Sequence, residues 1–200
     1  MTKRLIDIIG ATVGLVIFSP ILLTVAALIK RESPGPVFYK GVRAGKKRKP
    51  FKMFKFRSMV VNADKLGGPS TRGGDPRLTK IGAFIRRYKI DELPQLINVL
   101  KGDMSLVGPR PEVPHYAELY KGHEEKVYDV RPGMTDYASL WDIHEEEVLA
   151  KAKTSDEAEE IYLKEVRPTK VKLQLQYVHE KGLITDLKII GKTIKKILFH

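Results

Sequence analysis

The sequence contains no cysteine, which excludes disulfides and thiolate metal sites. Histidine is also scarce, and no two histidines show the i, i+4 spacing of a helical zinc site, so zinc is not expected. Acidic residues are too few to balance the basic ones, with 24 Asp and Glu against 36 Lys and Arg and a net charge of +12. A chain this basic usually binds nucleic acid, anionic lipid or phosphate-bearing substrates.

One apolar segment, Leu5–Ile29, dominates the first thirty residues and has basic residues at both ends. A straight helix of this length would run about 37 Å, enough for a hydrocarbon core of about 30 Å. Ser19-Pro20 interrupts it, because proline lacks an N–H and clashes with the preceding turn. The two halves, about 22 Å and about 13 Å long, are each too short to span.

The residues alone leave several interpretations of this segment open. A kinked spanning helix and a re-entrant hairpin both fit, since neighbouring groups tolerate proline in membrane helices. A secretory signal peptide cleaved near Thr24-Val25-Ala26 and a helix buried in a soluble core are further alternatives. A membrane segment favours anionic lipid and phosphate-bearing substrates as partners, so no nucleic-acid partner is expected.

The sequence divides into the membrane segment, residues 1–30, and one globular domain, residues 31–200. The linker Ser33-Pro34-Gly35-Pro36 lies near the boundary between them. We predict an α+β fold, mostly helical, with small strands. The expected strands are Val37–Tyr39, Phe51–Met59 and Met104–Val107; the expected helices are Leu78–Tyr88, Asp91–Leu100, Glu112–Lys121, Lys170–Glu180 and Leu183–Phe199, with more in the acidic insertion Asp142–Glu165. Residues Asn62–Pro76 are rich in glycine and proline and predict a loop. The last helix is basic and amphipathic, so it suits either a membrane interface or core packing.

Two patterns predict chemistry. Asp91-Glu92 opens a helix directly after the basic run Arg86-Arg87-Tyr88-Lys89, and both the helix dipole and the cations favour ionised carboxylates there. An ionised Asp91 could coordinate Mg²⁺, attack phosphorus or simply cap the helix. The second pattern, Gly108-Pro109-Arg110-Pro111, would hold one arginine on a stiff loop, either to bind phosphate or as an ordinary surface turn.

The residues also carry a family resemblance. The run from Ile90 to Glu112, IDELPQLINVLKGDMSLVGPRPE, closely resembles the signature of the bacterial sugar transferases, the monotopic phosphoglycosyl transferases that act on polyprenol phosphate. Lys55–Met59, Arg131–Thr135 and Asp186–Ile190 match further motifs of the family in the expected order, and Ser19-Pro20 matches its membrane-helix break. The chain is similar to the small members of this family.

The resemblance implies transfer of sugar-1-phosphate from a UDP-sugar to undecaprenyl phosphate, with release of UMP, as the first membrane step of a bacterial glycoconjugate pathway. Asp91 would be the nucleophile and would bind Mg²⁺, and Glu92 would assist activation of the lipid phosphate. The residues expected to bind substrate phosphates are Arg86, Arg110, Lys55, Arg57 and Pro109.

It also implies a location. The helix broken at Ser19-Pro20 would be re-entrant, with both ends on the cytoplasmic face of the inner membrane, where the domain contacts anionic lipids. Homodimer formation is left open. A membrane-tethered basic protein that binds anionic lipid or RNA without catalysis is the alternative function, and a metal-dependent phosphohydrolase is a third.

Two departures from the family pattern leave the transferred sugar undetermined. Asp136–Trp141 stands where many members carry Gly-Trp and Gln, and the acidic insertion follows it. Gln174 stands where many members carry Asp in the late helix.

Overall fold

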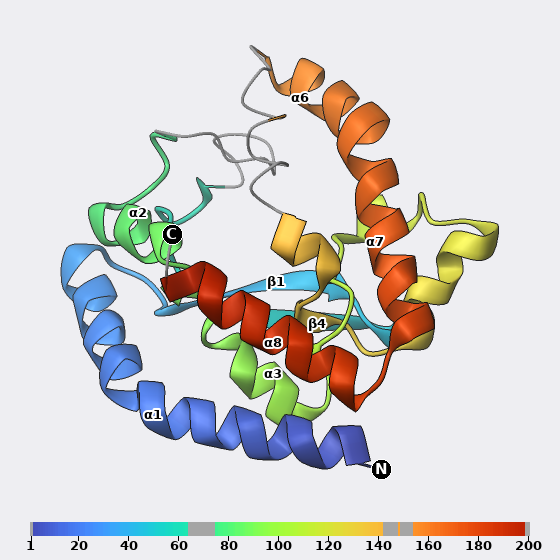
Figure 1. Cartoon of the computed structure of the whole chain (residues 1–200). Helices are drawn as coiled ribbons and strands as arrows, with labels where there is room; N and C mark the ends of the chain where they lie inside the picture. Colours follow the sequence, from blue (N-terminus) through green and yellow to red (C-terminus); the bar gives the residue numbers. More distant parts are fainter. Residues whose placement is uncertain (1, 64–74, 142–147, 149–153, 199–200) are drawn as a thin grey trace.

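The computed structural model describes residues 2–63, 75–141, 148 and 154–198. Most of the predicted loop Asn62–Pro76 and much of the acidic insertion Asp142–Glu165 lie outside the described residues. The described chain is mostly helical with two small sheets (Figure 1), which confirms the predicted α+β class.

The elements follow one another as short helices and strands after one long helix. The α-helices are α1 (Thr2–Glu32), α2 (Lys80–Arg87), α3 (Gln95–Lys101), α4 (Pro114–Ala117), α6 (Ser155–Ile161), α7 (Arg167–Glu180) and α8 (Leu183–Leu198). The 3₁₀ segments are η1 (Lys46–Arg48), η3 (Ile90–Glu92) and η4 (Gly122–Asp129), and the π-helical segment η5 (Tyr162–Val166) joins α6 to α7. The predicted helix Glu112–Lys121 is shorter than expected, because regular α-helix ends at Ala117.

The strands form two separate pairs. β1 (Phe38–Ala44) and β2 (Pro50–Phe56) form an antiparallel hairpin in which Gly41 pairs with Met53. β3 (Ser105–Val107) and β4 (Gly133–Thr135) pair in parallel, and α8 crosses in front of this region (Figure 1). β3 leads directly into the predicted Arg110 loop.

α1 is one continuous helix, so the predicted break at Ser19-Pro20 does not end it. Its ribbon bends along its course (Figure 1), and Pro20 is the proline within it. Proline cannot donate to the carbonyl four residues earlier, which is that of Val16. The hydroxyl of Ser19 donates to this carbonyl instead, at 2.8 Å. The bend therefore leaves no unpaired carbonyl at Val16.

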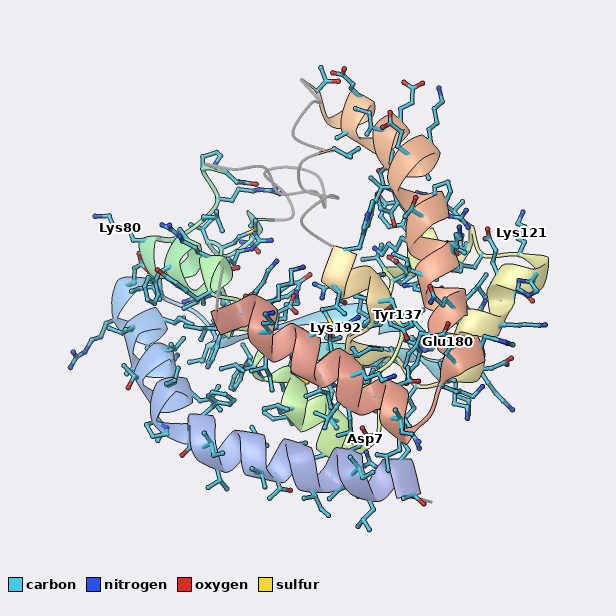
Figure 2. The ribbon with its side chains drawn as sticks, in the orientation of Figure 1. Asp7, Lys80, Lys121, Tyr137, Glu180 and Lys192 are labelled. Atoms are coloured by element: carbon cyan, nitrogen blue, oxygen red, sulfur yellow. The ribbon has the colours of Figure 1, made fainter. Side chains whose placement is uncertain are left out.

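Both halves of α1 pack on the globular domain. Near its N-terminus, the buried carboxylate of Asp7 accepts hydrogen bonds from the Ser105 hydroxyl at 2.9 Å and from the Leu106 N–H at 3.0 Å. Figure 2 shows Asp7 on the side of α1 that faces the domain. Near its C-terminus, Val25 and Ile29 pack in a buried cluster that also holds residues of β2 and α2. The two ends of the helix are thus fixed to the same body.

A second tie joins α1, β3, α7 and α8. The Lys3 ammonium donates to the carbonyl of Val107 at 3.0 Å and pairs with Asp186 at 2.6 Å. The buried Tyr177 hydroxyl contacts the same two residues, at 3.0 Å and 2.9 Å. Val107 is the last residue of β3, so these contacts fix the start of the Arg110 loop.

The outer side of α1 is apolar and uncovered, with Leu23 72% and Val16 67% exposed. Side chains project from this side away from the domain (Figure 2). This exposure does not fit a helix buried in a soluble core, because a core helix hides its apolar side chains. α8 is similar: Ile189 is buried, whereas Leu183, Ile184, Leu187, Ile194 and Ile197 are exposed.

Substitution of Gly133 tests how closely the short strands β3 and β4 pack together. A Cβ at this position would lie 2.0 Å from the backbone nitrogen of Gly108, so Gly133→Ala must push the backbones apart. We expect a loss of about 1–3 kcal/mol in the free energy of unfolding. Gly191→Ala in α8 is the matched control, because nothing lies within 4 Å of its added Cβ. It should stabilise the protein slightly. Denaturant unfolding in detergent measures both, and equal effects would contradict the described contact.

Candidate active site

Asp91 lies in the 3₁₀ turn η3, between α2 and α3. Lys89 adopts the left-handed conformation, with φ of 55°, and turns the chain out of α2. The prediction that Asp91 caps the next helix is wrong, because α3 begins at Gln95 with Pro94 at the capping position. Asp91 is only 5% exposed. The turn thus buries this carboxylate between two helices.

Glu92 joins three segments of the chain. Its Oε1 accepts hydrogen bonds from the Lys55 ammonium at 2.7 Å and from Arg110 Nη2 at 2.6 Å, and its Oε2 accepts from Arg110 Nη1 at 3.2 Å. The Arg110 contact is bidentate, which fixes the orientation of the guanidinium. The structure therefore brings Lys55, Glu92 and Arg110 together.

The two adjacent carboxylates ionise differently. Burial raises the pKa of Asp91, and the positive charge of Lys55 only partly offsets it. Burial also opposes ionisation of Glu92, but the charges of Arg110 and Lys55 outweigh it and hold the pKa of Glu92 well below its ordinary value. The expectation that the surroundings favour ionisation of both carboxylates is thus correct for Glu92 only, because desolvation dominates at Asp91.

Asn98 positions Lys55, a role that sequence reasoning missed. Its fully buried side chain accepts from the Phe54 N–H at 2.8 Å and donates to the Lys52 carbonyl at 2.9 Å. These bonds fix β2 against α3 on either side of Met53, directly before Lys55. An asparagine among the apolar residues of the predicted helix Asp91–Leu100 was the available signal, because buried amides need partners.

The Arg110 loop is held by backbone contacts, as its glycine and prolines predict. Gly108 N–H donates to the Thr135 carbonyl at 3.0 Å, and Gly133 N–H donates to the Pro109 carbonyl at 2.9 Å. Pro109 therefore contributes through its main chain. Gln174, which is fully buried in α7, donates to the Arg110 carbonyl at 3.4 Å. Gln174, which departs from the family pattern, thus stabilises the Arg110 loop through a main-chain contact.

The buried pair of Glu112 and Lys170, 3.0 Å apart, anchors the chain just beyond Arg110. The Glu112 carbonyl also accepts from the Ala44 N–H at 2.9 Å, which ties this segment to the end of β1.

The other two predicted arginines lie in different places. Arg86 is in the last turn of α2, and its charge lowers the pKa of Asp91, so it belongs to the same site. Arg57 is buried and donates to the end of α1, contacting the carbonyls of Ser33 (2.8 Å) and Pro34 and the Ser33 hydroxyl (3.0 Å). Its predicted contact with phosphate stays a prediction.

Asp91 and Glu92 are the carboxylates of the site that could bind a metal ion. Within the described residues, no group of three or more His, Cys, Asp or Glu side chains converges. Mg²⁺ does not need such a group, since it commonly binds one or two carboxylates together with substrate phosphates and water. Asp91 fits this mode as a single protein ligand, because the Glu92 oxygens already accept bonds from Lys55 and Arg110.

The candidate site is thus a buried carboxylate with cations fixed around it, on a domain whose N-terminal helix is long and apolar enough to anchor the protein to a membrane. A sequence model of the family described as bacterial sugar transferase matches residues 1–200, and the chain belongs to this family.

Curated relatives agree with this assignment. A UDP-N-acetylgalactosamine-undecaprenyl-phosphate N-acetylgalactosaminephosphotransferase of Aeromonas hydrophila is 38% identical over 98% of this chain and 43% of its own length. A UDP-glucose:undecaprenyl-phosphate glucose-1-phosphate transferase of Escherichia coli is 39% identical over 98% of this chain and 40% of its own length. The uncharacterized sugar transferase EpsL of Bacillus subtilis is 38% identical over 98% of this chain and 87% of its own length. The chain thus spans less than half of the Aeromonas and Escherichia proteins.

The charge on Glu92 predicts a pH dependence of stability. Because its pKa is lower in the folded protein, Glu92 stabilises the fold above its unfolded pKa, near 4.5, and this stabilisation disappears as the pH falls through the lower folded value. Glu92→Gln should therefore flatten the loss of stability below pH 4.5, at a cost of about 1–3 kcal/mol near neutral pH. The raised pKa of Asp91 acts in the opposite direction, and its largest cause, burial, is retained in the variant.

The measurement is the free energy of unfolding in denaturant as a function of pH. Glu118→Gln is the control, because it removes an exposed carboxylate. Parallel curves for Glu92→Gln and the unmodified protein would contradict the described ion pairs.

Proposed function

We propose that the protein transfers sugar-1-phosphate from a UDP-sugar to undecaprenyl phosphate and releases UMP, through a covalent intermediate on Asp91. The observation that supports this most directly is the buried carboxylate of Asp91 beside Glu92, which Lys55 and Arg110 hold by charged hydrogen bonds. Membership of the sugar transferase family, and the activities for which the Aeromonas and Escherichia relatives are named, support the substrate classes.

In the first half-reaction, a carboxylate oxygen of Asp91 attacks the phosphorus that carries the sugar. A new O–P bond forms, and the bond from this phosphorus to the bridging oxygen of UMP breaks. Burial leaves the attacking carboxylate poorly hydrated, which suits a nucleophile. Lys55, Arg86 and Arg110 supply positive charge to the diphosphate and to the departing UMP.

In the second half-reaction, a phosphate oxygen of undecaprenyl phosphate attacks the same phosphorus and frees Asp91. Glu92 assists activation of this acceptor in the proposal. Its contacts support an indirect way of doing so, because an ionised carboxylate that accepts from both Lys55 and Arg110 fixes the two cations that would bind the lipid phosphate.

Mg²⁺ is the proposed cofactor, bound by Asp91 and substrate phosphates. When bound, such an ion neutralises charge on the diphosphate. The protein's own residues then have to orient the sugar phosphate and exclude water from Asp91.

The proposed location is the cytoplasmic face of the inner membrane, with α1 re-entrant. Support comes from the packing of both halves of α1 on one domain, through Asp7 at one end and through Val25 and Ile29 at the other. A spanning helix would separate these ends by the membrane. The exposed apolar side chains of α8 support an interfacial position for that helix as well.

Intact-mass spectrometry tests the chemistry. The protein is incubated with Mg²⁺ and a panel of UDP-sugars in the absence of lipid. We expect a mass increase equal to one sugar phosphate, release of UMP, and discharge of the adduct by undecaprenyl phosphate. Asp91→Asn should abolish the adduct, because an amide oxygen is a poor nucleophile, and Asp129→Asn, at an exposed aspartate, should retain it.

EDTA added to the same reaction should slow adduct formation if a divalent cation takes part. Absence of adduct and UMP with every donor sugar would count against the transferase. Steady release of sugar phosphate without a lipid acceptor would indicate a hydrolase instead.

Thiol labelling tests the topology, because the chain has no cysteine of its own. Single cysteines replace Thr2 and Arg31 at the two ends of α1, and a third replaces Glu118 in the domain as a reference; all three positions are exposed. In intact cells, an impermeant thiol reagent should label none of them, and in lysed cells it should label all. Labelling of Thr2→Cys alone in intact cells would indicate a spanning helix.

A further inference from the structure

Arg43 has no role in the reaction described so far. It lies near the end of β1 and is partly buried. Within the described residues, it forms no ion pair at hydrogen-bond distance, and its side chain donates to the carbonyl of its own neighbour, Val42, at 2.8 Å. A buried or half-buried guanidinium usually has a carboxylate or phosphate partner, because desolvating the charge is costly.

The charges around Arg43 connect it to the active site. Burial lowers the pKa of Arg43 and the interaction with Tyr39 raises it; the charge of Arg110 lowers it, and the charges of Glu112 and Glu92 raise it. The N–H of Ala44, the residue after Arg43, donates to the Glu112 carbonyl at 2.9 Å, so the end of β1 lies against the Arg110 loop and the two guanidinium charges repel each other. An anion between two guanidinium groups would relieve this repulsion and accept hydrogen bonds from both.

The register of the hairpin places Arg43 on the face of the sheet that carries Lys55. Tyr39 pairs with Lys55, Gly41 with Met53 and Arg43 with Phe51. Paired residues, and residues two apart on one strand, share a face. Lys55 contacts Glu92 on this face, so Arg43 shares a face of the sheet with a residue of the candidate site; it lies four residues along β1 from Tyr39, the partner of Lys55.

Gly41 makes room for the Arg43 side chain. A Cβ added at Gly41 would lie 2.8 Å from the Tyr39 ring and 3.0 Å from Arg43 Nη1. The guanidinium and the ring thus extend over Gly41, toward each other. Both contacts are at the ends of flexible side chains, so Gly41→Ala should displace these ends and leave the backbone in place.

We propose that Arg43 is a further phosphate-binding residue, which acts with Arg110 on a phosphate group of the substrate farther from Asp91 than the one attacked. This inference rests on the proposed function. Two substrates carry such a group: the nucleotide, whose other phosphate leaves with UMP, and the lipid acceptor. Both present the same chemistry, a phosphate oxyanion that two guanidinium groups can bind.

Separate measurements of the two half-reactions identify the source. The rate of adduct formation on Asp91 reports the nucleotide phosphate, and the rate at which undecaprenyl phosphate discharges a preformed adduct reports the lipid phosphate. Arg43→Gln should slow one of these rates about tenfold or more, with the larger effect on the half-reaction whose phosphate Arg43 binds. Arg43→Lys should recover part of the rate, because it restores the charge without the bidentate geometry.

Two further variants separate binding from stability. Gly41→Ala keeps every charge but moves the guanidinium, so it should slow the same half-reaction as Arg43→Gln. Lys52→Gln removes one exposed positive charge from the same hairpin, on the opposite face, and should keep both rates within about twofold of the unmodified protein. Melting temperatures of all variants in detergent show whether each folds.

The outcomes differ for the two proposals. If the unmodified protein forms an adduct and folded Arg43→Gln matches Lys52→Gln in both rates, Arg43 binds no substrate phosphate and the inference is wrong. If the unmodified protein forms no adduct, the proposed function fails, and calorimetry with UMP and with undecaprenyl phosphate then tests the binding of phosphate by Arg43. Weaker UMP binding by Arg43→Gln than by Lys52→Gln would then support it. Equal binding of UMP, together with equal binding of undecaprenyl phosphate in detergent, would overturn it.

Discussion

The ion pairs of Glu92 are the interaction on which the active site depends. One carboxylate accepts bonds from Lys55 on the β1–β2 hairpin and from Arg110 on the loop after β3. Without it, two cations would face each other across a partly buried space, and each would have to turn toward water. Glu92 therefore keeps positive charge concentrated next to Asp91, where burial alone would discourage the ionisation of a nucleophile.

The rest of the fold can be understood as support for this arrangement. Asn98 fixes the strand that carries Lys55, while Gln174 and the Glu112–Lys170 pair hold the loop that carries Arg110. α1 reaches the same loop through its contacts with β3. The helix with the uncovered apolar side is thus also a structural partner of the candidate active site.

Local sequence patterns predicted much of this architecture. The apolar segment, the strands β1 to β3, most of the helices and the stiff Arg110 loop were expected from motifs and periodicity. The strand β4 was not predicted, and a shared site for Asp91 and Arg110 was expected only from the family resemblance. The prediction that Asp91 caps a helix was wrong, because Lys89 adopts the left-handed conformation and Pro94 occupies the capping position, so the next helix begins only at Gln95. The contacts of Arg57 and Arg43 could not be predicted, for a different reason. Whether an arginine meets a helix end or another arginine depends on strand register and on packing between distant segments, which no local pattern contains.

The hydroxyl of Ser19 has a consequence for the membrane itself. A bend in a helix usually exposes a carbonyl, and an exposed carbonyl in hydrocarbon attracts water to satisfy it. In α1 the carbonyl of Val16 already has the Ser19 hydroxyl as its partner. In the proposed re-entrant position, the bend of α1 would therefore need no water molecule at the Val16 carbonyl.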